Sequence, residues 1–243
     1  MAKQADGKSP HIFGSEHLDN LTLNVMEVDR LLSLHPAEQK ARRGRHHHVE
    51  VINKSCIVLL CACWEAFVED TAAAALVEML RFGSDYKIFP DKVLERVASN
   101  LQGPKAWALA GNGWRSAMED NLQSVLAKTT QALNTPKTDN VNELFNRTIG
   151  LDNVSRSWRW RGTGWLAAKI RLDAMVTLRH EIAHRVAGSR AVTLSDARQA
   201  RELVFRLSTL TNNAVFDFLH ARLAGDEWQA KSTWVRARYR WSR

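Results

Sequence analysis

The sequence predicts an all-α fold, and three observations lead to this prediction. Apolar residues make up 45% of the 243-residue chain, which is enough to build a hydrophobic core. They recur at three- and four-residue steps, the spacing of one helix face. Residues 15–223 contain no convincing alternating strand pattern, and no proline follows Pro136. We therefore expect long antiparallel helices with short accessory helices over 15–223, between a flexible tail over 1–14 and a basic aromatic extension over 224–243.

The N-terminal half contains one helix of ordinary length and one long helix. Residues 15–34 have helical periodicity, with Ser15 in the position of an N-cap and His35-Pro36 at the end. The long helix is expected over 47–82, where no proline or glycine occurs before Gly83. Weaker helical segments follow over 84–114, 115–133 and 141–148.

Three carboxylates lie within the long helix, in the sequence Trp64-Glu65-Ala66-Phe67-Val68-Glu69-Asp70. One interpretation is a helix edge that faces water. The other is that Glu65 or Asp70 meets a buried cation from another element, because a buried charge is costly without a partner. The sequence leaves both interpretations open.

Two further long helices are expected in the C-terminal half. The first runs over 165–186 and ends before Gly188, because glycine commonly terminates helices. The second runs over 193–223, with Thr193 as its N-cap and Asp196 three residues on, as in a capping box.

The composition of the chain indicates what kind of partner it binds and in which cellular compartment it works. The net charge of +8 favours a polyanion such as RNA or DNA. Cys56, Cys61 and Cys63 lie in one apolar segment, which fits buried thiols in a reducing cytoplasm. The N-terminus has no apolar signal core, and the longest apolar run, 57–64, is far short of the ~20 residues that a membrane-spanning helix needs. We expect a cytoplasmic protein with no membrane partner.

Residues 155–165 interleave arginines with tryptophans. Arg156, Arg159 and Arg161 alternate with three tryptophans, a composition that suits phosphate contact combined with base stacking. The same residues could equally pack on the domain as a structured loop. RNA binding by these arginines and a purely structural role are therefore both open.

The C-terminal extension is also basic and aromatic. Arg236, Arg238 and Arg240 would lie on one face if residues 235–241 were extended. A segment with so many aromatic residues is expected to dock, either on its own domain or on RNA.

The strongest functional signal is the segment Arg179-His180-Glu181-Ile182-Ala183-His184. On a helical wheel of ~100° per residue, Arg179 lies at the centre of the apolar stripe. A buried charge is costly unless it is paired, so we expect Arg179 either to have a carboxylate partner or to face a cleft or subunit interface. His180 and His184 lie on a polar ridge beside the stripe, and such a combination is typical of a functional site.

The same segment contains His-Glu-x-x-His, the motif of zinc peptidases. His180 and His184 would bind the metal and Glu181 would activate water. A third ligand is needed, and the residues that follow His184 contain no histidine at the required spacing. Glu202 lies 18 residues beyond His184, near but not at the spacing expected for a glutamate ligand. With no predicted sheet either, a zinc peptidase is a remote alternative.

The sequence resembles HEPN-domain ribonucleases of the RiboL-PSP or MAE type. Arg-x4-His over 179–184 matches their signature, and Leu-Leu-Cys-Ala-Cys-Trp-Glu-Ala-Phe-Val-Glu-Asp over 59–70 is similar to their long second helix. The resemblance covers roughly residues 15–223. It implies an all-α bundle that dimerises with the two motifs facing each other. It also implies RNA cleavage without a metal or cofactor, in toxin, phage-defence or RNA-processing roles.

The resemblance also implies a role for each residue. Arg179 would bind the scissile phosphate, and His184 would act as general acid or base around attack by the ribose 2′-hydroxyl. His180 would orient the phosphate, while Glu65, with Asp70 as a further candidate, would hold Arg179. The product would carry a 2′,3′-cyclic phosphate, and DNA would resist cleavage.

Two positions depart from the family pattern. Val186 stands where some HEPN toxins have a tyrosine that a partner nucleotidyltransferase modifies, so that regulation is not expected. Arg185 stands where the subgroup often has glycine, and it is a candidate for a further RNA contact. A non-catalytic HEPN module that binds RNA or protein is the main alternative. An antitoxin or defence-system partner is compatible with either function.

Overall fold

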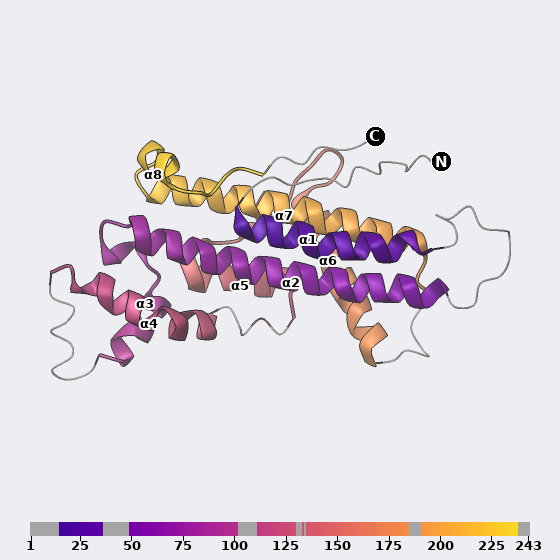
Figure 1. The fold of residues 1–243 in the computed structure, drawn as a ribbon, viewed down its shortest axis with the longest axis horizontal. Helices are drawn as coiled ribbons and strands as arrows, with labels where there is room; N and C mark the ends of the chain where they lie inside the picture. The colour runs from indigo at the N-terminus through magenta and orange to yellow at the C-terminus, as the bar shows by residue number, and fades with distance from the viewer. Residues whose placement is uncertain are drawn as a thin grey trace, which may run out of the picture.

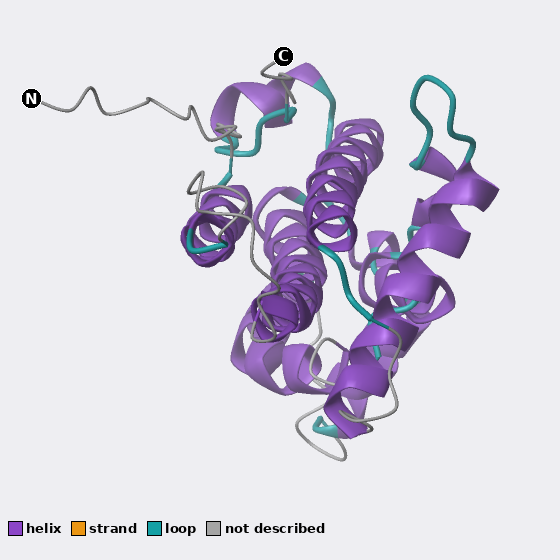
Figure 2. Ribbon diagram, turned by 90° about the vertical axis from the view of Figure 1, so that its right-hand side faces the viewer, coloured by secondary structure: helices purple, strands orange, loops and turns teal. Residues whose placement is uncertain are grey.

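The computed structural model describes residues 15–35, 49–101, 111–129, 133, 135–184 and 191–237. Over these residues the chain forms eight α-helices and two 3-10 helices and contains no β-strand (Figure 2). One isolated antiparallel bridge joins Trp160 and Thr163. The all-α prediction is confirmed, while the tail predicted over 1–14 lies outside the described residues.

Helix α2 is the central element of the bundle. The elements are α1 (Glu16–Ser33), α2 (Val49–Phe82), η1 (Tyr86–Ile88), α3 (Asp91–Ser99), α4 (Gly113–Thr129), α5 (Thr138–Ile149), η3 (Val154–Ser157), α6 (Trp165–His184), α7 (Leu194–Arg222) and α8 (Asp226–Lys231). In Figure 1, α1 and α2 lie antiparallel along the long axis, and α7 runs beside them. α2 packs against α1, α5, α6 and α7, whereas α3 and α4 lie together at one of its ends.

The long helix predicted over 47–82 forms as one unbroken element, α2. Trp64 is fully buried on its inner face, and its Nε1 donates a hydrogen bond to the Pro136 carbonyl at 3.0 Å. At Gly83 an added Cβ would lie 2.5 Å from the Met79 carbonyl oxygen, so a larger residue at this turn would force the backbone to shift. By length and composition α2 could cross a membrane, but half of its most apolar window is buried inside the protein, as in a core helix.

The sequence predicts the first residue of α7 but not that of α5. Thr193 and Asp196 form the expected capping box at α7. α5 begins at Thr138, earlier than the predicted residue 141, because Asp173 of α6 accepts hydrogen bonds from the Thr138 N–H and hydroxyl, both at 2.9 Å. A carboxylate at a helix N-terminus pairs an otherwise unpaired N–H and interacts favourably with the helix dipole. This cap comes from 35 residues away, so no local pattern reveals it.

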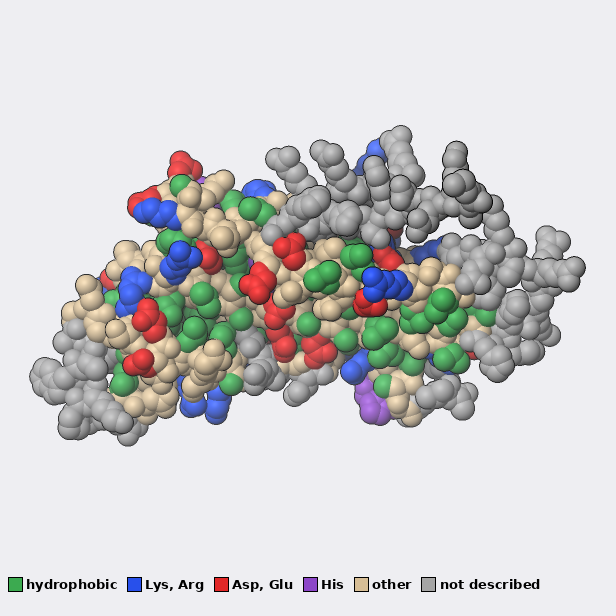
Figure 3. Space-filling view, in the orientation of Figure 1, with side chains coloured by type: hydrophobic (Ala, Val, Ile, Leu, Met, Phe, Trp, Pro, Cys, Tyr) green, Lys and Arg blue, Asp and Glu red, His purple; other side chains and the backbone are tan. Residues whose placement is uncertain are grey.

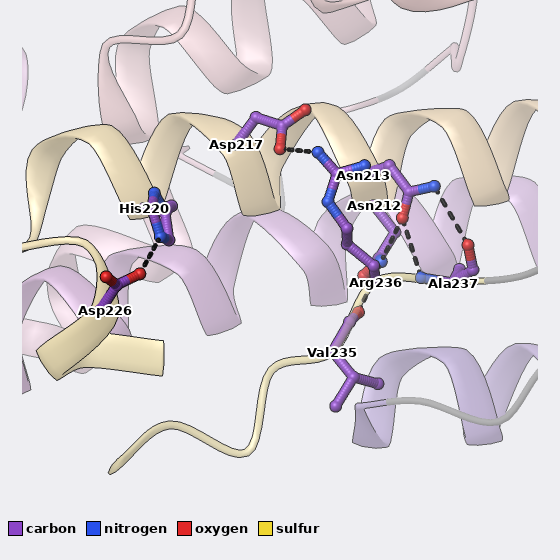
Figure 4. A network of polar contacts seen from close by, with 8 residues as sticks. All are labelled: Asn212, Asn213, Asp217, His220, Asp226, Val235, Arg236 and Ala237. Carbon is purple, nitrogen blue, oxygen red and sulfur yellow. Dashed lines mark hydrogen bonds and ion pairs between the residues drawn. The ribbon is translucent and has the colours of Figure 1, made fainter. Parts of the chain in front are cut away.

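The C-terminal extension docks on its own domain through residues 232–237, which we call the strap (Figure 4). Asn212 of α7 donates from Nδ2 to the Val235 carbonyl at 3.0 Å. Asn213 donates to the Ala237 carbonyl at 3.1 Å and accepts from the Ala237 N–H at 2.8 Å. Two successive amide side chains of α7 thus bond the strap as a neighbouring strand would.

Two further contacts fix the extension at its ends. Glu78 of α2 accepts hydrogen bonds from Trp228 Nε1 at 2.6 Å and from the Ser232 hydroxyl at 2.5 Å. Ser15 occupies the predicted N-cap position of α1, but its hydroxyl accepts from the Val235 N–H at 3.2 Å and makes no cap hydrogen bond. Of the two docking surfaces considered, the described part of the extension therefore uses its own domain.

His17 is buried between α1, α7 and the strap. Its side chain lies 2.8 Å (Nε2) from Asn212 Oδ1, and its ring lies 4.5 Å from that of Trp234. Burial lowers the pKa of His17 to about 4, against the opposing effects of the Asn212 hydrogen bond and of Asp19. The folded protein therefore holds this imidazole neutral.

We expect the protein to lose stability as the pH falls from about 6.5 to about 4. The pKa of His17 is lower in the folded chain than in the unfolded chain, so the unfolded chain takes up the proton first. The free energy of unfolding should fall by roughly 3 kcal/mol across this window from His17 alone. Urea denaturation at several pH values should show a smaller decrease in the free energy of unfolding for His17→Gln than for the wild type. Equal decreases in the two proteins would contradict this role.

Candidate functional site

Helix α6 lies along one side of the bundle (Figure 2). It packs mainly on α2 and less extensively on α5 and α7. On its outer face Leu166 and Ile170, one turn apart, are 57% and 68% exposed. On a wheel of ~100° per residue, these two residues lie on the same exposed face as His180 and His184, nearer the start of the helix.

Arg179 is half-buried near the C-terminal end of α6, on the side that faces α2. Burial raises the pKa of the Cys61 thiol to about 12 and also raises the pKa of the Glu65 carboxyl, and the positive charge of Arg179 opposes both shifts. Within the described part of the chain, Arg179 makes no direct hydrogen bond or ion pair. No described residue therefore occupies its N–H donors.

The two carboxylates considered as partners for Arg179 have different neighbours. Glu65 interacts with the charge of Arg179. Burial raises the pKa of Asp70, and the negative charge of Glu16 on α1 raises it further. Five helical positions rotate a side chain by roughly 140°, so these two carboxylates point toward different elements. The structure brings Glu65, and not Asp70, into electrostatic contact with Arg179.

His180 and His184 lie on the exposed side of α6 beside Arg179. Because they are four residues apart, they occupy adjacent turns of one face, and their ring centroids are 4.3 Å apart. On the same ridge Thr177 is exposed, while Asp173 is engaged at the start of α5. A half-buried cation thus stands next to two accessible imidazoles.

The zinc ligand set is incomplete in the described residues. Glu202 lies on α7 and forms an ion pair with Arg206, with 2.6 Å between the carboxylate oxygen and Nε. Across the described part of the chain, no three histidine, cysteine, aspartate or glutamate side chains come close enough to hold a metal ion. The histidine pair of the zinc motif, His180 and His184, therefore has no third ligand among the described residues.

The tryptophans of residues 155–165 pack on the domain. Trp158 is fully buried, and its Nε1 donates to the Thr211 hydroxyl at 2.9 Å. The Trp160–Thr163 bridge closes a tight turn, in which Gly162 has the left-handed φ of 77°. The structured-loop interpretation holds for the tryptophans, while Arg156, Arg159 and Arg161 remain exposed on this turn and its approach.

Among the described residues, the predicted RNA contacts do not gather around Arg179. The arginines of the turn precede α6, whereas Arg179 and His184 are near its end, about 20–30 Å away along the helix axis. Arg236 of the strap forms an ion pair with Asp217 of α7. Three further predicted contacts lie outside the described residues: Arg185, Arg238 and Arg240.

Cys61 is the neighbour of Arg179 that sequence reasoning missed. It precedes Glu65 by four residues and so lies on the same face of α2, which is a signal that the wheel contains. Its Sγ lies 3.8 Å from the Met175 carbonyl of α6 and donates to it. This contact helps to fix α6 against α2 at the level of the site.

Comparison with known proteins bears on the whole helical region. A family model described as RiboL-PSP-HEPN matches residues 27–216, which include α2, α6 and the Arg179–His184 segment. Neither the curated proteins nor the solved structures give a significant match.

Proposed function

Since the chain belongs to the RiboL-PSP-HEPN family, we propose that it is an endoribonuclease that cleaves RNA without a metal ion, through Arg179 and His184. The observation that carries this proposal is the state of Arg179. It is half-buried on the motif helix, makes no direct ion pair in the described part of the chain, and stands beside two exposed histidines. A cation held in this way suits a phosphate, which accepts several hydrogen bonds from one guanidinium.

In the proposed reaction the ribose 2′-oxygen attacks the adjacent phosphorus and the bond to O5′ breaks. The products carry a 2′,3′-cyclic phosphate and a 5′-hydroxyl. A base must take the proton of the 2′-hydroxyl and an acid must protonate O5′; His184 performs one of these transfers. Arg179 donates to the phosphate oxygens and offsets the charge that builds up on them. His180, one turn before His184, orients the phosphate.

We also propose a homodimer in which the two α6 helices meet with their motifs facing each other. Leu166 and Ile170 support this arrangement because they are exposed apolar side chains on the same face of α6 as His180 and His184. Arg156, Arg159 and Arg161 are exposed at the start of α6 and extend the RNA-binding surface away from the cleavage site. We place the activity in the cytoplasm, in RNA processing or in a toxin or phage-defence system with a neutralising partner.

The proposal is tested with single-stranded RNA and DNA of the same sequence, each with and without EDTA. We expect the purified chain to cleave only the RNA and to be insensitive to EDTA. RNA binding without cleavage of any strand would favour the non-catalytic HEPN module. Peptide hydrolysis that EDTA abolishes and that Glu181→Gln lacks would favour the zinc peptidase.

A further inference from the structure

A groove of about 460 Å³ separates α6 from α7, on the side of α6 away from the histidines. Its floor is apolar and includes Ile57 of α2, Met175 of α6 and Leu203 of α7. Trp160, from the turn that precedes α6, also lines the groove. This volume is at the small end of the range of roughly 300–1,000 Å³ for ligand pockets, so it suits one compact group.

The rim of the groove is polar and carries both signs of charge. Arg171, Glu202 and Arg206 lie on it, together with the Gln199 amide. The Arg206 guanidinium lies 5.2 Å above the centre of the Trp160 ring, and its Nε donates to Glu202 at 2.6 Å. A planar cation, a flat ring and a carboxylate therefore lie side by side over an apolar floor.

We propose that this groove binds a purine base of the RNA, with guanine as the best match. Bases stack on aromatic rings and on guanidinium planes, which Trp160 and Arg206 provide. Guanine offers O6 and N7 as acceptors for an arginine and N–H groups as donors for a carboxylate, and Arg171 and Glu202 on the rim supply one of each. Uracil has a smaller ring and lacks the exocyclic amino group.

Two arginines next to Trp160 indicate that the ligand of the groove is a nucleotide and not a free base. Arg159 and Arg161 flank Trp160 directly in the chain, and both are exposed. A phosphate joined to a base in the groove would come within reach of these cations. In this proposal Arg159 and Arg161 supply the positive charge that the phosphate needs, and the groove, whose rim carries both signs of charge, takes the base.

The groove would read a nucleotide other than the one that is cleaved. On a wheel of ~100° per residue, Arg171, Met175 and Leu178 lie roughly opposite His180 and His184. A base in the groove therefore cannot contact the imidazoles, and its role is to position the strand. This inference rests on the proposed function, and it adds the expectation that cleavage occurs at a fixed distance from a purine.

The test measures binding by fluorescence anisotropy, with full-length His184→Ala so that RNA stays intact. The probes are uridine strands of about ten nucleotides that carry one central guanosine, adenosine or cytidine, or none. We expect the guanosine strand to bind on the order of tenfold more tightly than the all-uridine strand. Ala200→Met, which fills the groove from α7, and Trp160→Ala should each remove this preference. Ala221→Met, on an exposed part of the same helix, should keep it.

Each outcome bears on the groove separately from catalysis. Equal affinity for all four strands, or a preference that survives both groove variants, would overturn the proposal. Thermal melting shows whether each variant is folded. If one groove variant fails to fold, the other variant and the comparison of the four strands on His184→Ala still test the proposal. A preference that the groove variants abolish would support the groove even if the wild type cleaves no RNA. Cleavage by the wild type at sites unrelated to purines would count against it.

Discussion

Replacing Arg179 with alanine is expected to lower the rate of RNA cleavage by a factor on the order of 10³, or about 4 kcal/mol of transition-state stabilisation. The guanidinium is half-buried and donates to no described group, and in the proposed reaction its N–H donors bind the phosphate. Lysine keeps the charge but not the planar pair of donors, and Arg179→Lys should recover only part of the rate. Single-turnover cleavage of a labelled RNA measures both variants.

The matched control for Arg179 is Arg30→Ala on α1. Arg30 is exposed and, among the described residues, forms an ion pair with Glu27 one turn away, so its loss should leave the rate within about twofold of the wild type. An Arg179→Ala protein that is folded and cleaves at the wild-type rate would remove Arg179 from the chemistry. We expect Arg179→Ala to fold, because Arg179 interacts with Glu65 through its charge alone and makes no hydrogen bond with a described residue.

Replacing Trp158 with alanine is expected to destabilise the protein by about 3–5 kcal/mol. The ring is fully buried, packs edge-on against Trp64 at 5.8 Å, and donates a hydrogen bond to Thr211. Truncation would leave a large cavity and an unpaired hydroxyl between η3, α2 and α7. Denaturant unfolding monitored by far-ultraviolet circular dichroism measures the loss.

Two variants separate the causes of this destabilisation. Trp158→Phe refills most of the space but leaves Thr211 without its donor, so it should cost less than the alanine variant. Trp160→Ala, at a half-buried neighbour, should also cost less. Equal losses for Trp158→Ala and Trp160→Ala would show that Trp158 is not the anchor of residues 155–165.

Local apolar periodicity predicted the helices that carry the core. α1, α2, α6 and α7 each bury a stripe that recurs every three or four residues, and the capping box at Thr193 is also local. The features that sequence reasoning missed depend on distant partners. α5 begins early because of Asp173, the Ser15 hydroxyl serves the strap, and the short helix α8 is held by Glu78 from α2.

The site was predictable to a similar extent. The wheel placed Arg179 among apolar residues and the two histidines together, because one helix holds all three. The sequence does not show whether Glu65 or Asp70 lies near Arg179, since this depends on which sides of α2 are covered by α6 and α1. The groove was also beyond its reach, because its walls come from α2, α6, α7 and the turn at Trp160.

The most direct test of the central claim uses an RNA with a single 2′-deoxy nucleotide at the main cleavage site, in buffer that contains EDTA. We predict that the wild type cleaves the all-ribose strand to a product ending in a 2′,3′-cyclic phosphate. The bond that follows the 2′-deoxy nucleotide should stay intact, because the attacking hydroxyl is missing. Cleavage of that bond, or a requirement for a divalent metal ion, would contradict the assignment of Arg179 and His184 as a metal-independent ribonuclease site.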